Sequence, residues 1–354
     1  MKNIENIQKS FKNKKILVTG HTGFKGAWLC LWLKELGAEV SGYSLPPNTS
    51  PNLYYILDLG IAETLADIND KKALGKHLQK YQPEIIFHLA AQPLVRESYR
   101  DPVGTFQTNI AGIWNLLDAI KKTPSVKVIV VVTTDKCYKN NETGIPFIET
   151  DALGGYDPYS ASKACVEIIC DSWRSSFLSE KNKPLLATVR AGNVIGGGDW
   201  ASDRLLPDCI KSFIGEKPID LRYPNALRPW QHVLEALSGY IILAEKLYNF
   251  GNKYAEAWNF GPYIENQATV GDVVSMAANL WGIKNLSKNK SLNNPHEADL
   301  LRLNITKATS KLDWVPQWNI QQTITETVDW YKKWHEGEDM LKYSLNQIKK
   351  YINN

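Results

Sequence analysis

The sequence has little of several features that mark particular classes of protein. Its 354 residues carry a formal net charge of only +4, which gives no indication of a nucleic-acid-binding surface. No apolar run reaches the ~18 residues that a membrane-spanning helix needs, and the polar, charged N-terminus has no apolar signal segment. We therefore expect a cytoplasmic protein without nucleic-acid or membrane partners.

Cysteine and histidine are also scarce. The five cysteines are an odd number without a Cys-x-x-Cys pair, which favours reduced thiols over a disulfide framework. None of the six histidines forms a pair at metal-ligand spacing, so we predict no metal site. The 44% hydrophobic and 22% charged content is that of an ordinary globular protein, and the chain is long enough for one large domain or two.

The first half of the sequence alternates between short apolar runs and more polar, amphipathic stretches. The runs predict strands at residues 15–19, 40–43, 63–66, 85–90, 126–133 and 185–189. The stretches between them predict helices at 27–36, 70–81 and 101–120, and a further helix that carries Tyr159 and Lys163. This alternation predicts an α/β fold with a doubly wound parallel Rossmann sheet.

The composition changes after about Val194. The segment Gly196-Gly197-Gly198-Asp199-Trp200 is a glycine-rich break, and eight of the twelve tryptophans lie from Trp200 onward. We expect residues 1–193 to form a dinucleotide-binding Rossmann domain with the Tyr159/Lys163 pair, and residues 194–354 to form a smaller lobe that mainly binds substrate. The lysine-rich tail from Lys342 is predicted to be a surface helix.

A glycine-rich turn follows the first predicted strand. Its three glycines are spaced three apart between a strand and a helix, where they let backbone N–H groups approach a pyrophosphate at the positive helix end. The predicted cofactor-binding residues of this turn are Gly20, Thr22, Gly23, Phe24, Lys25 and Gly26. For a bare glycine triplet the alternative is an unliganded strand–helix turn.

The segments after the next strands bear on the choice of dinucleotide. Ser41–Pro46 contains no acid for the ribose hydroxyls and no arginine for a 2′-phosphate, and NAD is favoured over NADP. Asp67-Ile68 follows the third strand and is a candidate contact for the adenine. Ala90-Ala91-Gln92 follows the fourth strand, where the chain passes the adenosine ribose, and Leu89, Ala90 and Ala91 are predicted cofactor contacts. Ordinary tight packing explains Ala90 and Ala91 equally well.

Asp-Pro-Tyr-Ser-Ala-Ser-Lys is the most informative motif, because Tyr159 and Lys163 lie four apart on a predicted helix and point the same way. A nearby ammonium lowers the pKa of a phenol from its ordinary value near ~10. We expect Tyr159 to take a proton from a substrate hydroxyl beside the dinucleotide. The pattern predicts a nicotinamide enzyme that oxidises an alcohol.

Thr134-Asp135-Lys136 ends the fifth predicted strand, at the carboxyl edge where ligands of such sheets bind. Thr134 is expected to hydrogen-bond a substrate hydroxyl and share its proton with Tyr159. Asp135 and Lys136 add an acid and a base next to it. Without the Tyr/Lys pair, a loop of solvated polar residues would be an equally good interpretation.

At this point the chain resembles the extended short-chain dehydrogenase/reductase family, which modifies nucleotide-bound sugars. The resemblance runs from Gly20 to about Trp318. Within the family the chain is most similar to the branch of 4,6-dehydratases that act on CDP-glucose, since relatives acting on dTDP-glucose have Thr-Asp-Glu in place of Thr134-Asp135-Lys136. The segments that carry the similarity are Gly-His-Thr-Gly-Phe-Lys-Gly, Thr-Thr-Asp-Lys-Cys-Tyr, Asp-Ala-Leu-Gly-Gly-Tyr-Asp-Pro-Tyr-Ser-Ala-Ser-Lys, Val-Arg-Ala-Gly-Asn-Val-Ile-Gly-Gly-Gly-Asp-Trp and Arg-Pro-Trp-Gln-His-Val.

The resemblance implies loss of water from CDP-glucose with a tightly held NAD that is regenerated in each turnover. It implies that Tyr159 takes the proton of the sugar's 4-hydroxyl, which Thr134 orients. Lys163 would lower the pKa of Tyr159 and bind the nicotinamide ribose. Asp135 is the candidate acid for the departing 6-hydroxyl, and Lys136 is expected to serve the elimination step.

Further contacts and an assembly are expected as well. The resemblance puts Asn193 against the sugar or diphosphate. Arg204, Arg228 and Arg302 have the guanidinium geometry for diphosphate oxygens, although a surface ion pair is the ordinary role of a single arginine. A homodimer or homotetramer is implied, with a contact from residues 102–120 and 160–177 that uses the apolar surface of Ile113, Trp114 and Ile168.

Two other interpretations stay open. A nucleotide-sugar 4-epimerase would share the fold, NAD and the Tyr/Lys pair, but it needs no acid and base for elimination, so Asp135 and Lys136 argue against it. A dinucleotide-sensing regulatory protein would have the fold without turnover. Such a protein has no need for Tyr159 and Lys163 together.

Overall fold

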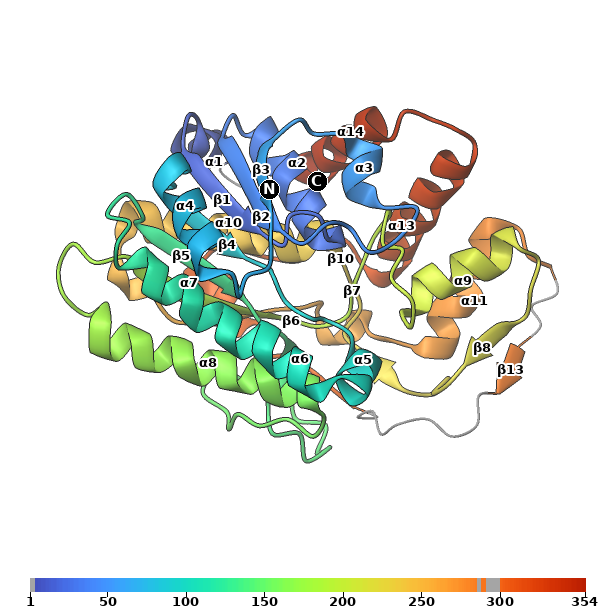
Figure 1. Ribbon diagram of the computed structural model, residues 1–354. Helices are drawn as coiled ribbons and strands as arrows, with labels where there is room; N and C mark the ends of the chain where they lie inside the picture. The colour runs from blue at the N-terminus through green and yellow to red at the C-terminus, as the bar shows by residue number, and fades with distance from the viewer. Residues whose placement is uncertain (1–3, 285–287, 291–299) are drawn as a thin grey trace.

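The computed structural model describes residues 4–284, 288–290 and 300–354. Within them, the centre is a parallel sheet of seven strands (Figure 1). In spatial order they are β3 (Ala62–Leu65), β2 (Glu39–Ser44), β1 (Lys15–Thr19), β4 (Ile85–His88), β5 (Val128–Val132), β6 (Leu185–Ala191) and β11 (Ala257–Phe260). The order reverses between β1 and β4, which is where open α/β sheets bind ligands. The predicted doubly wound sheet is confirmed.

The central strands are buried on both faces, as their sequences require. In β1, β4 and β5 every residue except Lys15 is buried. Unbroken apolar runs of this kind are typical of parallel strands covered by helices on both sides. β4 and β5 end at His88 and Val132, earlier than predicted, so the segments that follow them are loops at the carboxyl edge.

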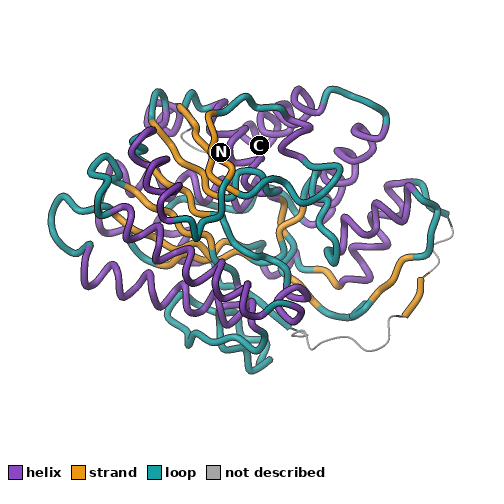
Figure 2. The backbone as a smooth tube through the Cα atoms, in the orientation of Figure 1, coloured by secondary structure: helices purple, strands orange, loops and turns teal. Residues whose placement is uncertain are grey.

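Helices cover both faces of the sheet (Figures 1 and 2). One hydrophobic cluster joins the sheet to α4 (Lys71–Tyr81), α7 (Gly112–Ile120) and α8 (Pro158–Phe177). The other joins it to α1 (Ile4–Phe11), α2 (Phe24–Glu35), α10 (Val233–Phe250), α13 (Ile320–His335) and α14 (Met340–Asn353). The helix predicted at 101–120 is divided into α6 (Pro102–Phe106), a π-helical turn η1 (Gln107–Ala111) and α7.

The C-terminal half adds short ladders and helices beside the sheet. Its elements are β7 (Val194–Ile195), α9 (Leu205–Ile214), β8 (Ile219–Leu221), β9 (Leu227–Arg228), β10 (Gln231–His232), η3 (Asn252–Tyr254), η4 (Ile264–Asn266), β12 (Ala268–Thr269), α11 (Val270–Trp281), β13 (Lys288–Lys290) and α12 (Thr306–Lys311). The remaining elements are α3 (Leu53–Leu57), α5 (Val95–Arg100) and η2 (Asp135–Cys137). α10 and β11 belong to the sheet layer although they follow residue 194. The division into 1–193 and 194–354 stays a prediction.

The tail forms the predicted helix, but the expectation of a surface helix is wrong for one side of it. Met340, Ile348 and Tyr351 of α14 are buried. The Tyr351 hydroxyl donates a hydrogen bond of 2.6 Å to Glu235, a buried residue of α10. The tail therefore packs into the core through an apolar face.

In the described residues no helix is both long and apolar enough to cross a membrane. The same part of the chain has no group of three or more His, Cys, Asp or Glu side chains arranged to hold a metal ion. All five cysteines are free thiols.

Candidate active site

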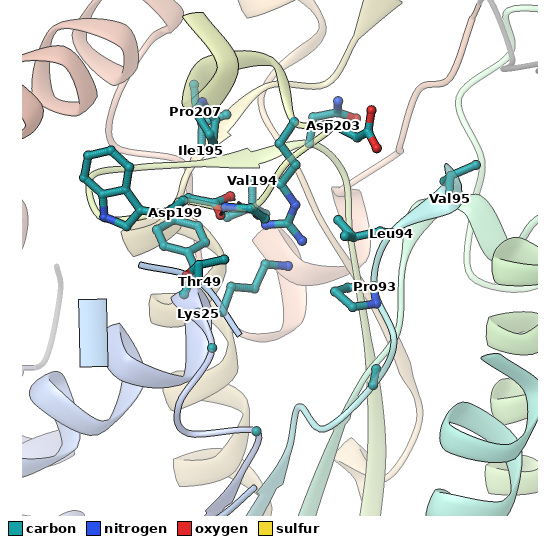
Figure 3. Close-up of a pocket in the computed structure, with 18 of the residues that line it drawn as sticks. Lys25, Thr49, Pro93, Leu94, Val95, Val194, Ile195, Asp199, Asp203 and Pro207 are labelled. Carbon is teal, nitrogen blue, oxygen red and sulfur yellow. Dashed lines mark hydrogen bonds and ion pairs between the residues drawn. The ribbon is translucent and has the colours of Figure 1, made fainter. Parts of the chain in front are cut away.

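A cavity of about 820 Å³ lies at the carboxyl edge of the sheet. Its walls come from the segments that follow the strands of the first half and from the loops and α9 of the second half. Figure 3 shows Lys25 extending into it, with Pro93 and Leu94 on one side and Asp199 on the other. Such a volume suits a small-molecule site at the point where the strand order reverses.

The glycine turn between β1 and α2 is built for close approach of a ligand. Gly20 has φ +75°, and a Cβ there would lie 2.7 Å from the Ala90 nitrogen. A Cβ on Gly26 would lie 2.1 Å from the Gly20 carbonyl oxygen. Gly23 is the N-cap of α2 and offers no side-chain cap, so the first N–H groups of this helix are left for an anion in the cavity.

Thr19 joins this turn to the loop after β4. Its hydroxyl oxygen accepts the N–H groups of Leu89 and Ala90 at 3.2 and 3.3 Å. All predicted cofactor-binding residues of the two loops, together with Asp67 and Ile68, line the one cavity. An open helix N-terminus and a crowded glycine turn, with the apolar side chains of Ile68 and Leu89 in the same cavity, fit a dinucleotide.

Local sequence sets the start of α8 and so the position of Tyr159. Asp157 accepts the Ser160 N–H at 2.9 Å, and the Ser160 hydroxyl oxygen accepts the Asp157 N–H at 3.1 Å, which is a capping box. Pro158 is at the first helical position, where its missing N–H costs nothing. Tyr159 therefore lies in the first turn and Lys163 one turn later, and both line the cavity with 8% and 6% of their surface exposed.

The electrostatics of this pair differ from the expectation. Burial raises the pKa of Tyr159 to about 12, while a hydrogen bond with Thr134 and the charge of Arg204 act in the opposite direction. The net shift is therefore opposite to the predicted lowering, and the contribution of Lys163 to the Tyr159 pKa stays a prediction. The Lys163 ammonium instead donates to the Val132 carbonyl at 3.1 Å. Burial lowers the pKa of Lys163 to about 8, against the charge of Glu167.

Thr134, Asp135 and Lys136 lie in and before η2 and line the cavity next to Tyr159. The Thr134 hydroxyl donates to one Asp135 oxygen at 3.0 Å. The other, Oδ2, is buried without a hydrogen-bond partner among the described residues. A Cβ on Gly192 would approach this Oδ2 to 2.9 Å, so glycine leaves room beside it. An unpartnered carboxyl oxygen next to a phenol is a candidate proton donor.

The predicted substrate residues are placed differently from one another. Asn193, Arg204 and Arg228 line the cavity, and Arg204 pairs with Asp199 at 2.7 Å. Arg302 is not among the cavity-lining residues; it donates to Gln267 at 3.1 Å and to the Gly144 carbonyl at 3.4 Å.

The sequence interpretation missed three basic residues that line the cavity, Arg96, Lys211 and Arg222. Arg96 lies a few residues after β4, and residues in that position could have been predicted to lie at the ligand-binding edge of the sheet. Lys211 on α9 and Arg222 after β8 come from a region without such a pattern. In addition, burial lowers the pKa of Lys25 to about 7, with the charges of Arg204 and Lys163 acting in the same direction.

The fold and the cavity define a dinucleotide-binding enzyme with a Tyr/Lys pair, and comparison with known proteins makes this more specific. The family model described as GDP-mannose 4,6 dehydratase matches residues 17–327. The chain belongs to this family.

Individual relatives narrow the similarity further. The chain is 46% identical over 353 residues to the CDP-glucose 4,6-dehydratase of Salmonella typhimurium, with 98% of each chain covered. Among solved structures, UDP-glucose 4-epimerase of Thermotoga maritima with UDP-glucose has a TM-score of 0.80 at 22% identity, covering 90% of this chain and 99% of that one. dTDP-glucose 4,6-dehydratase of Bacillus anthracis in complex with NAD has a TM-score of 0.76 at 22% identity, covering 93% and 99%. The likeness to these two structures concerns the fold.

Proposed function

We propose that this protein converts CDP-glucose to CDP-4-keto-6-deoxyglucose and water, with NAD as a cofactor that ends each turnover oxidised. The observation that carries the proposal is the meeting of Tyr159 and Lys163 with Thr134, Asp135 and Lys136 in one cavity. The first pair suits alcohol oxidation, and the triplet adds groups for elimination. The 46% identity to a CDP-glucose 4,6-dehydratase supports the choice of sugar nucleotide.

The cofactor would lie along the glycine turn, with its pyrophosphate at the N-terminus of α2 and its nicotinamide end near Lys163. When bound, NAD⁺ supplies the hydride acceptor and a positive charge beside Tyr159. Tyr159 removes the proton of the sugar's 4-hydroxyl as a tyrosinate, a form that the positive charges of bound NAD⁺ and of Lys163 would favour once its own proton has left to solvent. The Thr134 hydroxyl orients the sugar hydroxyl. Lys163, held by the Val132 carbonyl, binds the nicotinamide ribose.

The elimination uses the triplet after β5. A ketone at carbon 4 makes the hydrogen on carbon 5 acidic. Lys136, which is half-buried and lines the cavity, is the residue we propose for this elimination step, in which a lysine acts as a base only in its neutral form. Asp135, whose Oδ2 atom has no hydrogen-bond partner among the described residues, is our candidate acid for the departing 6-hydroxyl, a role that requires the protonated form of its carboxyl group. Bound NAD would supply to carbon 6 the hydride that it had accepted from carbon 4, and a proton returned to carbon 5 leaves water as the only group lost.

Arg204, Arg228 and Asn193 all line the cavity, and two guanidinium groups suit the oxygens of a diphosphate. We propose that these residues hold the nucleotide part of the substrate. On this basis residues 194–354 mainly serve substrate binding.

The test is to incubate the protein and NAD with CDP-, dTDP-, UDP- and GDP-glucose and to follow each sugar nucleotide by mass. We expect CDP-glucose to lose one water and the other three to react poorly. Comparable turnover of dTDP-glucose would contradict the substrate assignment. Epimerisation without loss of water would favour a 4-epimerase, and no turnover of any sugar would favour a regulatory protein.

A homo-oligomer and a cytoplasmic location stay predictions. Exposed apolar side chains on α6, α7 and α8 support a helix-mediated contact between copies of the chain; they are Val103, Phe106, Trp114, Ile168 and Phe177. Ile113 was expected to contribute to this surface, but it is fully buried against the sheet. The contact we propose therefore uses Trp114 and Ile168.

A further inference from the structure

Glu167 lies on α8 one turn beyond Lys163 and two turns beyond Tyr159, on the same face of the helix. Its side chain is 1% exposed, and it does not line the cavity. The proposed reaction therefore does not use this carboxylate directly. A buried charge is nevertheless costly unless it is paired, so its contacts need an explanation.

Both oxygens of Glu167 are occupied, and each bond leads to another element of the site. Oε1 accepts the Thr133 hydroxyl at 2.5 Å. Oε2 accepts the Thr188 hydroxyl at 2.7 Å and the Arg190 guanidinium at 2.8 Å. Thr133 directly precedes Thr134, and Thr188 and Arg190 lie on β6, which leads to Asn193. One carboxylate thus joins α8, the end of β5 and β6.

The partner of Glu167 is itself held in place. The Arg190 guanidinium donates to the Tyr138 hydroxyl at 2.7 Å and to the Glu149 carbonyl at 3.0 Å, and its side chain is 4% exposed. The hydrogen bond and charge of Arg190, with both threonine hydroxyls, hold the pKa of Glu167 below its usual value although burial raises it. Glu167 is therefore a fixed negative charge in a dry environment.

The charge acts on Lys163. Burial lowers the pKa of Lys163 to about 8, and Glu167 is the largest influence that raises it, followed by Cys170 on α8 and Cys137 in η2. Two further groups interact with Lys163 from other elements. Burial lowers the pKa of His88 on β4 to about 3, and the pKa of Lys25 on α2 is lowered to about 7. Without Glu167, Lys163 would keep its hydrogen bond to the Val132 carbonyl but lose the largest of the charges that favour its ammonium form.

We propose that Glu167 is a positioning residue that keeps Lys163 charged and fixes the β5 end, with Thr133 and Thr134, against α8. Its role rests on the proposed function, because Lys163 and Thr134 act in that reaction. Two effects follow that can be separated. The charge governs the protonation of Lys163, and the hydrogen bond to Thr133 governs the placement of Thr134.

The experiment measures kcat and KM against pH with the sugar nucleotide that the wild-type protein turns over. Glu167→Gln keeps the shape and removes the charge, so the alkaline limb of kcat should move to lower pH by about one unit or more, with little change in KM. Glu167→Asp keeps the charge, so the alkaline side of the pH profile of kcat should stay at its wild-type position. The value of kcat should fall, because the shorter side chain no longer reaches the Thr133 hydroxyl. Thr133→Val should likewise leave the alkaline side of the pH profile of kcat at its wild-type position and lower the value of kcat.

Glu235→Gln is the matched control. Glu235 is a buried carboxylate with hydrogen bonds from Tyr351 and two backbone N–H groups, on α10 and outside the cavity. The Glu235→Gln substitution should leave the pH profile of kcat unchanged. Carbon-13 lysine NMR of Lys163 gives a readout that needs no turnover, so the inference can be tested even if CDP-glucose is not the substrate.

A folded Glu167→Gln protein with the wild-type pH profile and an unshifted Lys163 titration would overturn the inference. If Glu167→Gln does not fold, Thr133→Val and Glu167→Asp decide it: wild-type kcat in both would overturn the positioning role. Failure of the wild-type protein to turn over CDP-glucose would count against the proposed function alone.

Discussion

Tyr159→Phe separates chemistry from binding, because it removes one oxygen and leaves the ring. The ring is 8% exposed and stays in the first turn of α8. The variant loses the hydrogen bond with Thr134, which is worth about 0.5–1.5 kcal/mol, and part of this is offset because a buried hydroxyl no longer has to be desolvated. The fold and the cofactor site should therefore survive.

The catalytic rate of Tyr159→Phe, in contrast, should fall steeply. Loss of a general base lowers the rate by ~10²–10⁴-fold, or about 3–5 kcal/mol of transition-state stabilisation, several times the change in stability. The assay is loss of water from CDP-glucose by mass, with NAD affinity measured by calorimetry on the same samples. Tyr156→Phe is the matched control, since Tyr156 is 80% exposed and outside the cavity. Turnover by Tyr159→Phe near that of this control would remove Tyr159 from the mechanism.

Three further predictions concern the elimination, the core and the assembly. Lys136→Met should form the reduced nicotinamide absorbance with CDP-glucose yet release no water; normal water loss would disprove its role, and absence of the absorbance would assign it to binding or oxidation. Burial raises the pKa of Glu235 from 4.5 to about 7, so the folded state holds this proton more tightly and the stability it gives is lost as pH rises between these values. The free energy of unfolding, from urea titrations, should fall by about 3 kcal/mol over that interval, and Glu235→Gln should flatten the fall; equal slopes would contradict this. Light scattering should give at least two chains per particle and Trp114→Glu should give one, whereas a monomeric wild-type protein at micromolar concentration would refute the proposed contact.

Much of the site was predictable because it depends on short stretches of sequence. The spacing of Gly20, Gly23 and Gly26, the Asp157-Pro158 helix start and the four-residue step from Tyr159 to Lys163 are each fixed within one turn or loop. Parallel strands place their carboxyl ends at one edge, so loops after separate strands meet in one cavity without any further information. For this reason the cofactor loops and the Thr134-Asp135-Lys136 segment could be grouped before the structure was known.

Other features depended on contacts between distant segments, which carry no local pattern. The direction of the Tyr159 pKa shift follows from burial, and burial is decided by everything packed around the helix. Arg302 has the chemistry of a phosphate ligand, but its position directs it to Gln267. Ile113 and Trp114 are neighbours on α7, but Ile113 faces the sheet and is buried, whereas Trp114 is exposed.

The buried network of Glu167 shows the limit most clearly. Its partners Thr133, Thr188 and Arg190 lie 34, 21 and 23 residues away along the chain, directly after β5 and on β6. In the sequence alone, Glu167 is one more charged residue on a helix, where a solvated position would be the ordinary expectation. The sequence by itself determined the alternation of strands and helices in the first half of the chain and the sheet edge at which the loops after those strands meet. Only the tertiary structure decided which charged side chains are buried away from solvent, because desolvation is a property of the packed chain and not of any one segment.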